Sequence, residues 1–133
     1  MDQIIKNAQK VIESEITGLK DLKEVCLVQK QPLSDPSWFG FMMTLKDNVT
    51  FTRNDIVEFL EDNNIQTRNL FAGNMLRHPM FDSLEEGKDY KVTSKLPNTD
   101  KIMHDTFWIG LYPGMSDDAI NYMIKKIREF VLK

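Results

Sequence analysis

The order of helical and strand patterns is the feature of this sequence that most constrains its fold. Apolar residues recur every three or four positions in four segments, which predicts amphipathic helices over residues 2–19, 53–62, 96–104 and 117–132. Runs rich in β-branched and aromatic residues predict strands over residues 24–29, 38–46, 65–72 and 106–112. Because strands and helices are mixed with short connections, we expect an α+β fold. It should be a small, mostly antiparallel sheet of about four strands with helices packed on one face.

Several helix starts carry a residue suited to capping. Thr52 is an expected N-cap, and Asp55 stands at the third helical position, where it can complete a capping box. Ser116 should cap the last helix, and either Asn98 or Thr99 should cap the short helix before it.

The run from Trp38 to Lys46 is the clearest strand, because it is aromatic and continuous enough to lie in the centre of the sheet. Gly40 stands between two phenylalanines in this run. A glycine inside a strand indicates a bulge or a close approach of another group to the backbone.

Composition bounds the class of protein. At 133 residues the chain is expected to form a single domain, residues 1–133. With 17 basic against 20 acidic residues and no basic block, a nucleic-acid binder is not expected. No apolar run approaches the roughly 20 residues of a membrane span, so no membrane partner is expected and a cytoplasmic location fits. The single cysteine, Cys26, lies in an apolar run and is expected to be a buried core residue.

The segment from Thr67 to Phe81 departs from the ordinary pattern. Its apolar part, residues 70–72, is expected to be buried, and donors surround it. Arg68 and Arg77 are planar forks suited to carboxylate or phosphate, and the Gly73-Asn74 pair tolerates positive φ, so that a ligand can approach the backbone. Two interpretations stay open: a binding segment, or a buried strand that leaves its sheet through a polar loop.

No complete active site can be assembled from the sequence. His78 and His104 are far apart and have no partners at metal-ligand spacing, so no metal is expected. Neither a phosphate-binding loop nor a nucleophile motif occurs. Neighbouring acids such as Glu85-Glu86 are expected to be solvated charge.

Several blocks nevertheless carry a specific resemblance when taken together. They are Trp-Phe-Gly-Phe at 38–41, Phe-Ala-Gly-Asn at 71–74, Arg-His-Pro at 77–79, Leu-Pro-Asn-Thr-Asp at 96–100 and Thr-Phe-Trp-Ile-Gly at 106–110. In this order the chain, from about residue 4 to residue 130, resembles the carboxy-terminal domain of the DegT/DnrJ/EryC1/StrS family. These are pyridoxal-phosphate-dependent nucleotide-sugar aminotransferases and dehydrases. The branch most similar is that of the lipopolysaccharide-type CDP-4-keto-6-deoxy-glucose 3-dehydrases.

The resemblance implies a parent enzyme about three times as long. The cofactor, its aldimine lysine (a histidine in the dehydrase branch) and the aspartate at the pyridine nitrogen belong to a large amino-terminal domain. It implies that this chain holds no cofactor and that alone it is inactive, because the electron-sink chemistry belongs to pyridoxal phosphate. The small domain of such enzymes closes over the cofactor cleft near a dimer interface and contacts the sugar nucleotide. The implied partners are therefore a nucleotide-sugar substrate, the large domain and a possible second copy.

Carried onto this sequence, the resemblance makes Arg68 the substrate-facing cation and Gly73-Asn74 the close-approach turn. Arg77 and His78 become rim contacts, and residues 38–39 pack beneath the site. An exposed apolar patch around Ile4, Val11 and residues 70–71 is expected where the large domain docks. The alternative hypothesis is a freestanding binding or interaction module that keeps this fold and does no chemistry.

Overall fold

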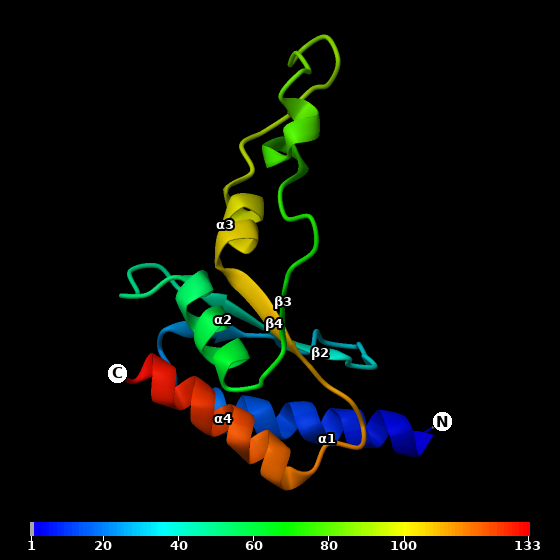
Figure 1. The fold of residues 1–133 in the computed structure, drawn as a ribbon. Coiled ribbons are helices and arrows are strands. Elements are labelled where there is room, and N and C mark those ends of the chain that lie inside the picture. The colour runs from blue at the N-terminus through cyan, green and yellow to red at the C-terminus, as the bar shows by residue number, and fades with distance from the viewer. Residues whose placement is uncertain (1) are drawn as a thin grey trace.

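The computed structural model describes the backbone of residues 2–133 and the side chains of residues 6–133. The helices are α1 (Asp2–Leu19), α2 (Arg53–Asp62), α3 (Pro97–Asp105) and α4 (Asp117–Val131). The strands are β1 (Val25–Leu27), β2 (Gly40–Leu45), β3 (Thr67–Asn69) and β4 (Thr106–Gly110). The predicted order of elements is confirmed, and each strand is shorter than its apolar run (Figure 1).

The four strands form one antiparallel sheet in the order β1-β2-β4-β3. The strand predicted to be central, β2, is central, and β4 lies beside it with Met43 opposite Phe107. The strand that carries Arg68 is an edge strand and pairs only with β4. The α+β class with an antiparallel four-stranded sheet is thus confirmed.

One face of the sheet carries the core. In β2 the buried residues alternate, with Phe41, Met43 and Leu45 turned toward the helices, as the period of two in a strand requires. The helices that complete this core are α1, α2 and α4, and among the described side chains α3 contributes none to the buried cluster. Figure 1 shows α1 and α4 side by side beneath the sheet.

Two of the predicted caps are confirmed. The Thr52 hydroxyl accepts from the Asp55 backbone N–H at 3.3 Å, and the Asp55 carboxylate accepts from the Thr52 N–H at 2.7 Å, which completes the capping box. Ser116 accepts from the backbone N–H three residues on. For α3 the prediction was wrong, because the helix begins at Pro97, one residue before the expected caps. A proline at the first helical position has no N–H to satisfy and a φ already suited to the helix.

Two predictions of burial were wrong. Cys26 is exposed, because β1 is an edge strand in which Val25 faces the core and the next side chain faces the opposite side. The segment 70–72 is not a buried continuation of β3: Phe71 is 81% exposed, with φ of 30°, and Ala72 is exposed. An edge strand paired over only three residues leaves these side chains without a layer to pack against.

The expected apolar patch is only partly present. Val11 is buried in the core, so its assignment to an exposed patch was wrong. Ile4 lies outside the described side chains. Phe71 alone of the described members is strongly exposed. In the part of the chain that the structure describes, no helix is long and apolar enough to cross a membrane.

Residues 70–96 form a projection that we call the arm (Figure 1). It contains two short 3₁₀ helices, Met75–Arg77 and Pro79–Phe81, and a long irregular return to α3. None of its side chains from residue 75 to residue 96 is buried. The arm contains the excursion loop predicted over residues 81–93 and places four of the five sequence-predicted site residues at its root.

Candidate functional site

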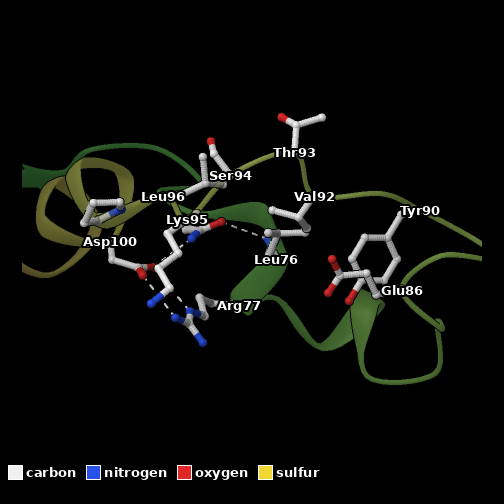
Figure 2. A pocket seen from close by; sticks show the side chains of 12 residues that line it. Leu76, Arg77, Glu86, Tyr90, Val92, Thr93, Ser94, Lys95, Leu96 and Asp100 are labelled. Atoms are coloured by element: carbon white, nitrogen blue, oxygen red, sulfur yellow. Dashed lines mark hydrogen bonds and ion pairs between the residues drawn. The ribbon is translucent and has the colours of Figure 1, made fainter.

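The root of the arm is held by a carboxylate at the start of α3. Arg77 donates from Nε to Asp100 Oδ1 at 3.2 Å and from Nη2 to Asp100 Oδ2 at 3.0 Å, a two-bond fork. Asn74 donates from Nδ2 to the same Oδ1 at 2.7 Å (Figure 2). The Asn74 amide oxygen accepts from the Leu76 N–H at 3.1 Å and so caps the first 3₁₀ helix.

These hydrogen bonds change the pKa values of both Asp100 and Arg77. Hydrogen bonds from Arg77 and then from Asn74 hold the pKa of Asp100 below its ordinary value of 3.8. The same pairing raises the pKa of Arg77. The pair therefore stays charged at neutral pH, and two of the donor groups of the arginine are engaged within the chain.

Gly73, Asn74 and His78 also make internal contacts. Gly73 has φ of 62°, as the turn prediction required, and the group that approaches it closely is Met103 of α3: a Cβ on Gly73 would lie 2.6 Å from the Met103 Cγ. Asn74 is buried. His78 Nε2 is hydrogen-bonded to the backbone carbonyl of Ala72. The structure thus brings residues 73, 74, 77 and 78 together: the contacts of the first three fix the arm on α3, and His78 bonds within the arm.

Arg68 lies apart from this cluster, on β3. Its side chain is exposed and donates from Nη1 to the Thr67 carbonyl at 2.8 Å. With the Gln66 amide oriented to satisfy both side chains, its oxygen accepts from Arg68 Nη2 at 2.9 Å. Within residues 6–133 no carboxylate forms an ion pair with Arg68. Hydrogen bonds from Thr67 lower the pKa of Glu61, and the guanidinium of Arg68 lowers it further to a smaller extent.

Beside Arg68 stands a row of three aromatic rings. Trp108 is opposite Arg68 in the sheet register. Phe39 meets the Trp108 ring edge-on at 4.8 Å between centroids, and Phe71 meets it at 5.9 Å. Trp38 lies elsewhere, packed against the core and beside a small cleft that Gln9 of α1 also lines. Of the two aromatic residues expected beneath the site, only Phe39 packs on Trp108, the β4 residue opposite Arg68.

A cleft of about 700 Å³ opens between the two limbs of the arm. Its polar lining residues include Thr93, Ser94, Lys95, Glu86 and the Arg77–Asp100 pair, and Figure 2 shows Lys95 on the side of that pair. Such a lining can hydrogen-bond a polyhydroxyl or phosphorylated ligand. Asp100 and Lys95 were not among the site residues predicted from the sequence. Asp100 could have been found, because it lies in the block at 96–100 that carries part of the family resemblance.

Neither a metal nor pyridoxal phosphate has a fitting set of ligands among the described side chains. No group of three or more His, Cys, Asp or Glu side chains in residues 6–133 lies close enough to hold a metal. Pyridoxal phosphate, which the resemblance implies, needs a phosphate cradle and an acid facing its ring nitrogen. In the arm cleft the arginine and the acid are already bonded to each other, and Lys95 is exposed. These residues therefore do not fit the cofactor.

Comparison with known proteins adds independent evidence. The sequence matches the profile of the DegT/DnrJ/EryC1/StrS aminotransferase family over residues 1–128. It is 45% identical over 116 residues to the dTDP-4-dehydro-2,6-dideoxy-D-glucose 3-dehydratase of Saccharopolyspora spinosa, covering 87% of this chain and 24% of that relative. It is 47% identical over 97 residues to the lipopolysaccharide biosynthesis protein RfbH of Salmonella typhimurium, covering 73% of this chain and 21% of the relative.

The fold is also found in solved structures. The GDP-4-keto-6-deoxy-D-mannose-3-dehydratase of E. coli with bound hydrated PLP gives a TM-score of 0.81 at 23% identity, over 94% of this chain and 31% of that chain. A GDP-4-keto-6-deoxymannose-3-dehydratase with a trapped PLP-glutamate geminal diamine gives 0.80 at 25% identity, over 95% of this chain and 31% of that chain. The chain thus spans about a quarter of these curated relatives and a third of the solved chains. The sequence blocks, the fold and these matches agree, and the chain belongs to the DegT/DnrJ/EryC1/StrS aminotransferase family.

Proposed function

We propose that this chain acts as the carboxy-terminal small domain, residues 1–133, of a pyridoxal-phosphate-dependent nucleotide-sugar 3-dehydratase or aminotransferase. Its pathway would be deoxysugar or lipopolysaccharide biosynthesis in the cytoplasm. Its own contribution is to bind the nucleotide sugar and to close the cleft over it. The observation that carries the proposal is the 45% identity over 116 residues to a dTDP-sugar 3-dehydratase.

In the complete enzyme, pyridoxal phosphate supplies the electron sink for the chemistry on the sugar. The residues of this chain bind and orient the substrate. Arg68 is the principal contact, because its exposed guanidinium has no carboxylate partner within the described side chains and can take a phosphate oxygen pair. Nucleoside diphosphates carry such oxygens.

Gly73, Asn74, Arg77 and His78 are proposed as the second part of the binding surface. The Arg77 side chain is 61% exposed even though two of its nitrogens, Nε and Nη2, donate to Asp100. Asn74 is buried and hydrogen-bonded to Asp100, so its proposed role is to hold the turn in place and not to touch the substrate with its side chain. The freestanding-module alternative has no observation in its favour.

The proposal is tested by a two-dimensional amide NMR titration of the chain with CDP-, GDP-, UDP- and dTDP-hexoses. We expect shifts at Arg68 and at residues 73–78, and the hexose that binds tightest identifies the nucleotide. Arg68→Gln should weaken binding at least tenfold, the loss of one charge-assisted contact of about 1.4 kcal/mol or more.

Lys20→Gln is the matched control, because it removes one exposed positive charge from outside the site. It should leave binding unchanged. Flat spectra at millimolar ligand, with the fold intact, would reject substrate binding by this chain. An equal loss in both variants would show that only net charge matters.

A further inference from the structure

We propose that the arm is a preformed docking element for the cofactor-binding domain, by which the small domain is held against the rest of the enzyme. This inference rests on the proposed function. It gives residues 70–96 a second role, in addition to the substrate contacts proposed for four residues at the root of the arm.

The arm leaves several apolar side chains more than a third exposed, although Phe71 at its root meets the ring of Trp108. Met75 is 54% exposed, Met80 60% and Leu84 38%, and Phe71 at the root is 81% exposed. Methionine adapts well to an irregular partner surface and is frequent at protein-binding surfaces. Because the arm projects away from the helices and the sheet, these side chains cannot reach the core (Figure 1).

The arm is nevertheless ordered by polar and aromatic contacts of its own. Near the tip, Phe81 meets Tyr90 edge-on at 5.1 Å, and the Gly87 N–H donates to the Tyr90 carbonyl at 2.7 Å. At the root, Asp100 holds Asn74 and Arg77. A segment that has no buried apolar side chain but is fixed at its root and near its tip is preorganised for binding, which lowers the entropy lost on association.

The size of the relatives indicates the occupant. The chain covers 31% of the solved 3-dehydratase chains at 94–95% of its own length, so two thirds of those enzymes lie outside the matching region. That remainder is the surface on which an apolar arm of the small domain would pack.

Charge gives a second property of the partner surface. Residues 82–91 at the tip carry four acids, at positions 82, 85, 86 and 89, against two lysines, Lys88 and Lys91, and Lys88 forms an ion pair with Glu85 at 3.5 Å. We therefore expect the docking surface to combine apolar pockets with basic side chains, and the contact to weaken as salt is added.

The test uses a chimera in which this chain replaces the segment of the Salmonella relative that it matches. Hydrogen exchange of residues 75–84 is compared between the chimera and the isolated 133-residue chain. We expect exchange at least tenfold slower in the chimera. Met80→Glu should restore the fast rate, whereas Leu33→Glu, at a fully exposed position outside the arm, should leave protection intact.

Equal exchange in the chimera and in the isolated chain would overturn the proposal. Concentration-dependent protection in the isolated chain, with a dimer in sedimentation equilibrium that Met80→Glu dissociates, would assign the arm to a second copy and would overturn it too. If the whole-chain chimera does not fold, grafting residues 70–96 alone into the Salmonella protein gives the same comparison. The hydrogen-exchange protection is measured without substrate. Docking of the arm can therefore be confirmed or rejected even if the NMR titration shows no binding of a sugar nucleotide.

Discussion

Gly40 of β2 makes room for the indole ring of Trp108 on β4. A Cβ built on Gly40 would lie 1.9 Å from Trp108 Cε3, far inside contact distance. The two residues are diagonal neighbours, since Gly40 is paired with Gly110 and Met42 with Trp108. The glycine predicted to mark a close approach therefore does so, and the approaching group is a side chain of the neighbouring strand.

We expect Gly40→Ala to destabilise the fold by about 1–3 kcal/mol, because the methyl group displaces the Trp108 ring and the ring of Phe39 beside it. Urea unfolding followed by tryptophan fluorescence measures this. Gly110→Ala is the matched control on the opposite strand, where a Cβ meets nothing within 4 Å. Equal free energies of unfolding for the two variants would contradict the steric account.

A buried carboxyl group makes the stability depend on pH. Glu15 of α1 is fully buried, neither of its oxygens has a hydrogen-bond partner, and burial raises its pKa from 4.5 to about 8. The folded state therefore holds a proton that the unfolded state releases above pH 4.5. Stability from this group is greatest below pH 4.5 and falls until about pH 8, by about 5 kcal/mol in all.

Glu15→Gln should remove most of this slope, so that the variant is more stable than the wild type at pH 9 and similar at pH 5. Urea midpoints across this pH range are the measurement. Glu13→Gln, two positions away and exposed, is the control and should keep the wild-type slope. Parallel curves for Glu15→Gln and the wild type would reject a protonated Glu15.

Asp100 should control the order of the arm root without controlling the stability of the core. We expect Asp100→Asn to speed amide exchange at residues 76–78 several-fold, because the Arg77 fork loses its charged acceptor, while the urea midpoint barely changes. Since the pKa of Asp100 is lowered, the wild-type contact is present above pH 3.8 and is lost as the pH falls below that value.

Asp82→Asn at the tip of the arm provides the comparison, because it removes an equal charge and no ion pair within the described residues. It should leave exchange at residues 76–78 unchanged. Unaltered exchange in Asp100→Asn would show that Gly73 and Met103 alone fix the root.

The exposed thiol of Cys26 should react in the native state. One thiol per chain is expected to be modified by a disulfide reagent in native buffer, at a rate within about tenfold of that in urea. The Cys26→Ser variant has no thiol and is the control that should not react with the reagent. Reaction only in urea would mean that the thiol is buried after all.

The sequence by itself determined the order of helices and strands, the capping box of α2, the N-cap of α4 and the family. These follow from local properties: apolar periodicity, cap residues such as Thr52 with Asp55, and short blocks such as residues 106–110. The close approach of another group to the backbone at Gly40 was also one of two alternatives predicted from the sequence, because a glycine inside a strand indicates either a bulge or such an approach.

Only the tertiary structure decided what lies on the faces and at the ends of these elements. That Cys26 and Phe71 are exposed depends on β1 and β3 being edges of the sheet, and edge position is set by pairing between distant segments. The same holds for the candidate site. Arg77, Asn74 and Asp100 meet because the arm returns to α3, whereas Arg68, nine residues from Arg77 in the sequence, remains on the sheet with its guanidinium exposed.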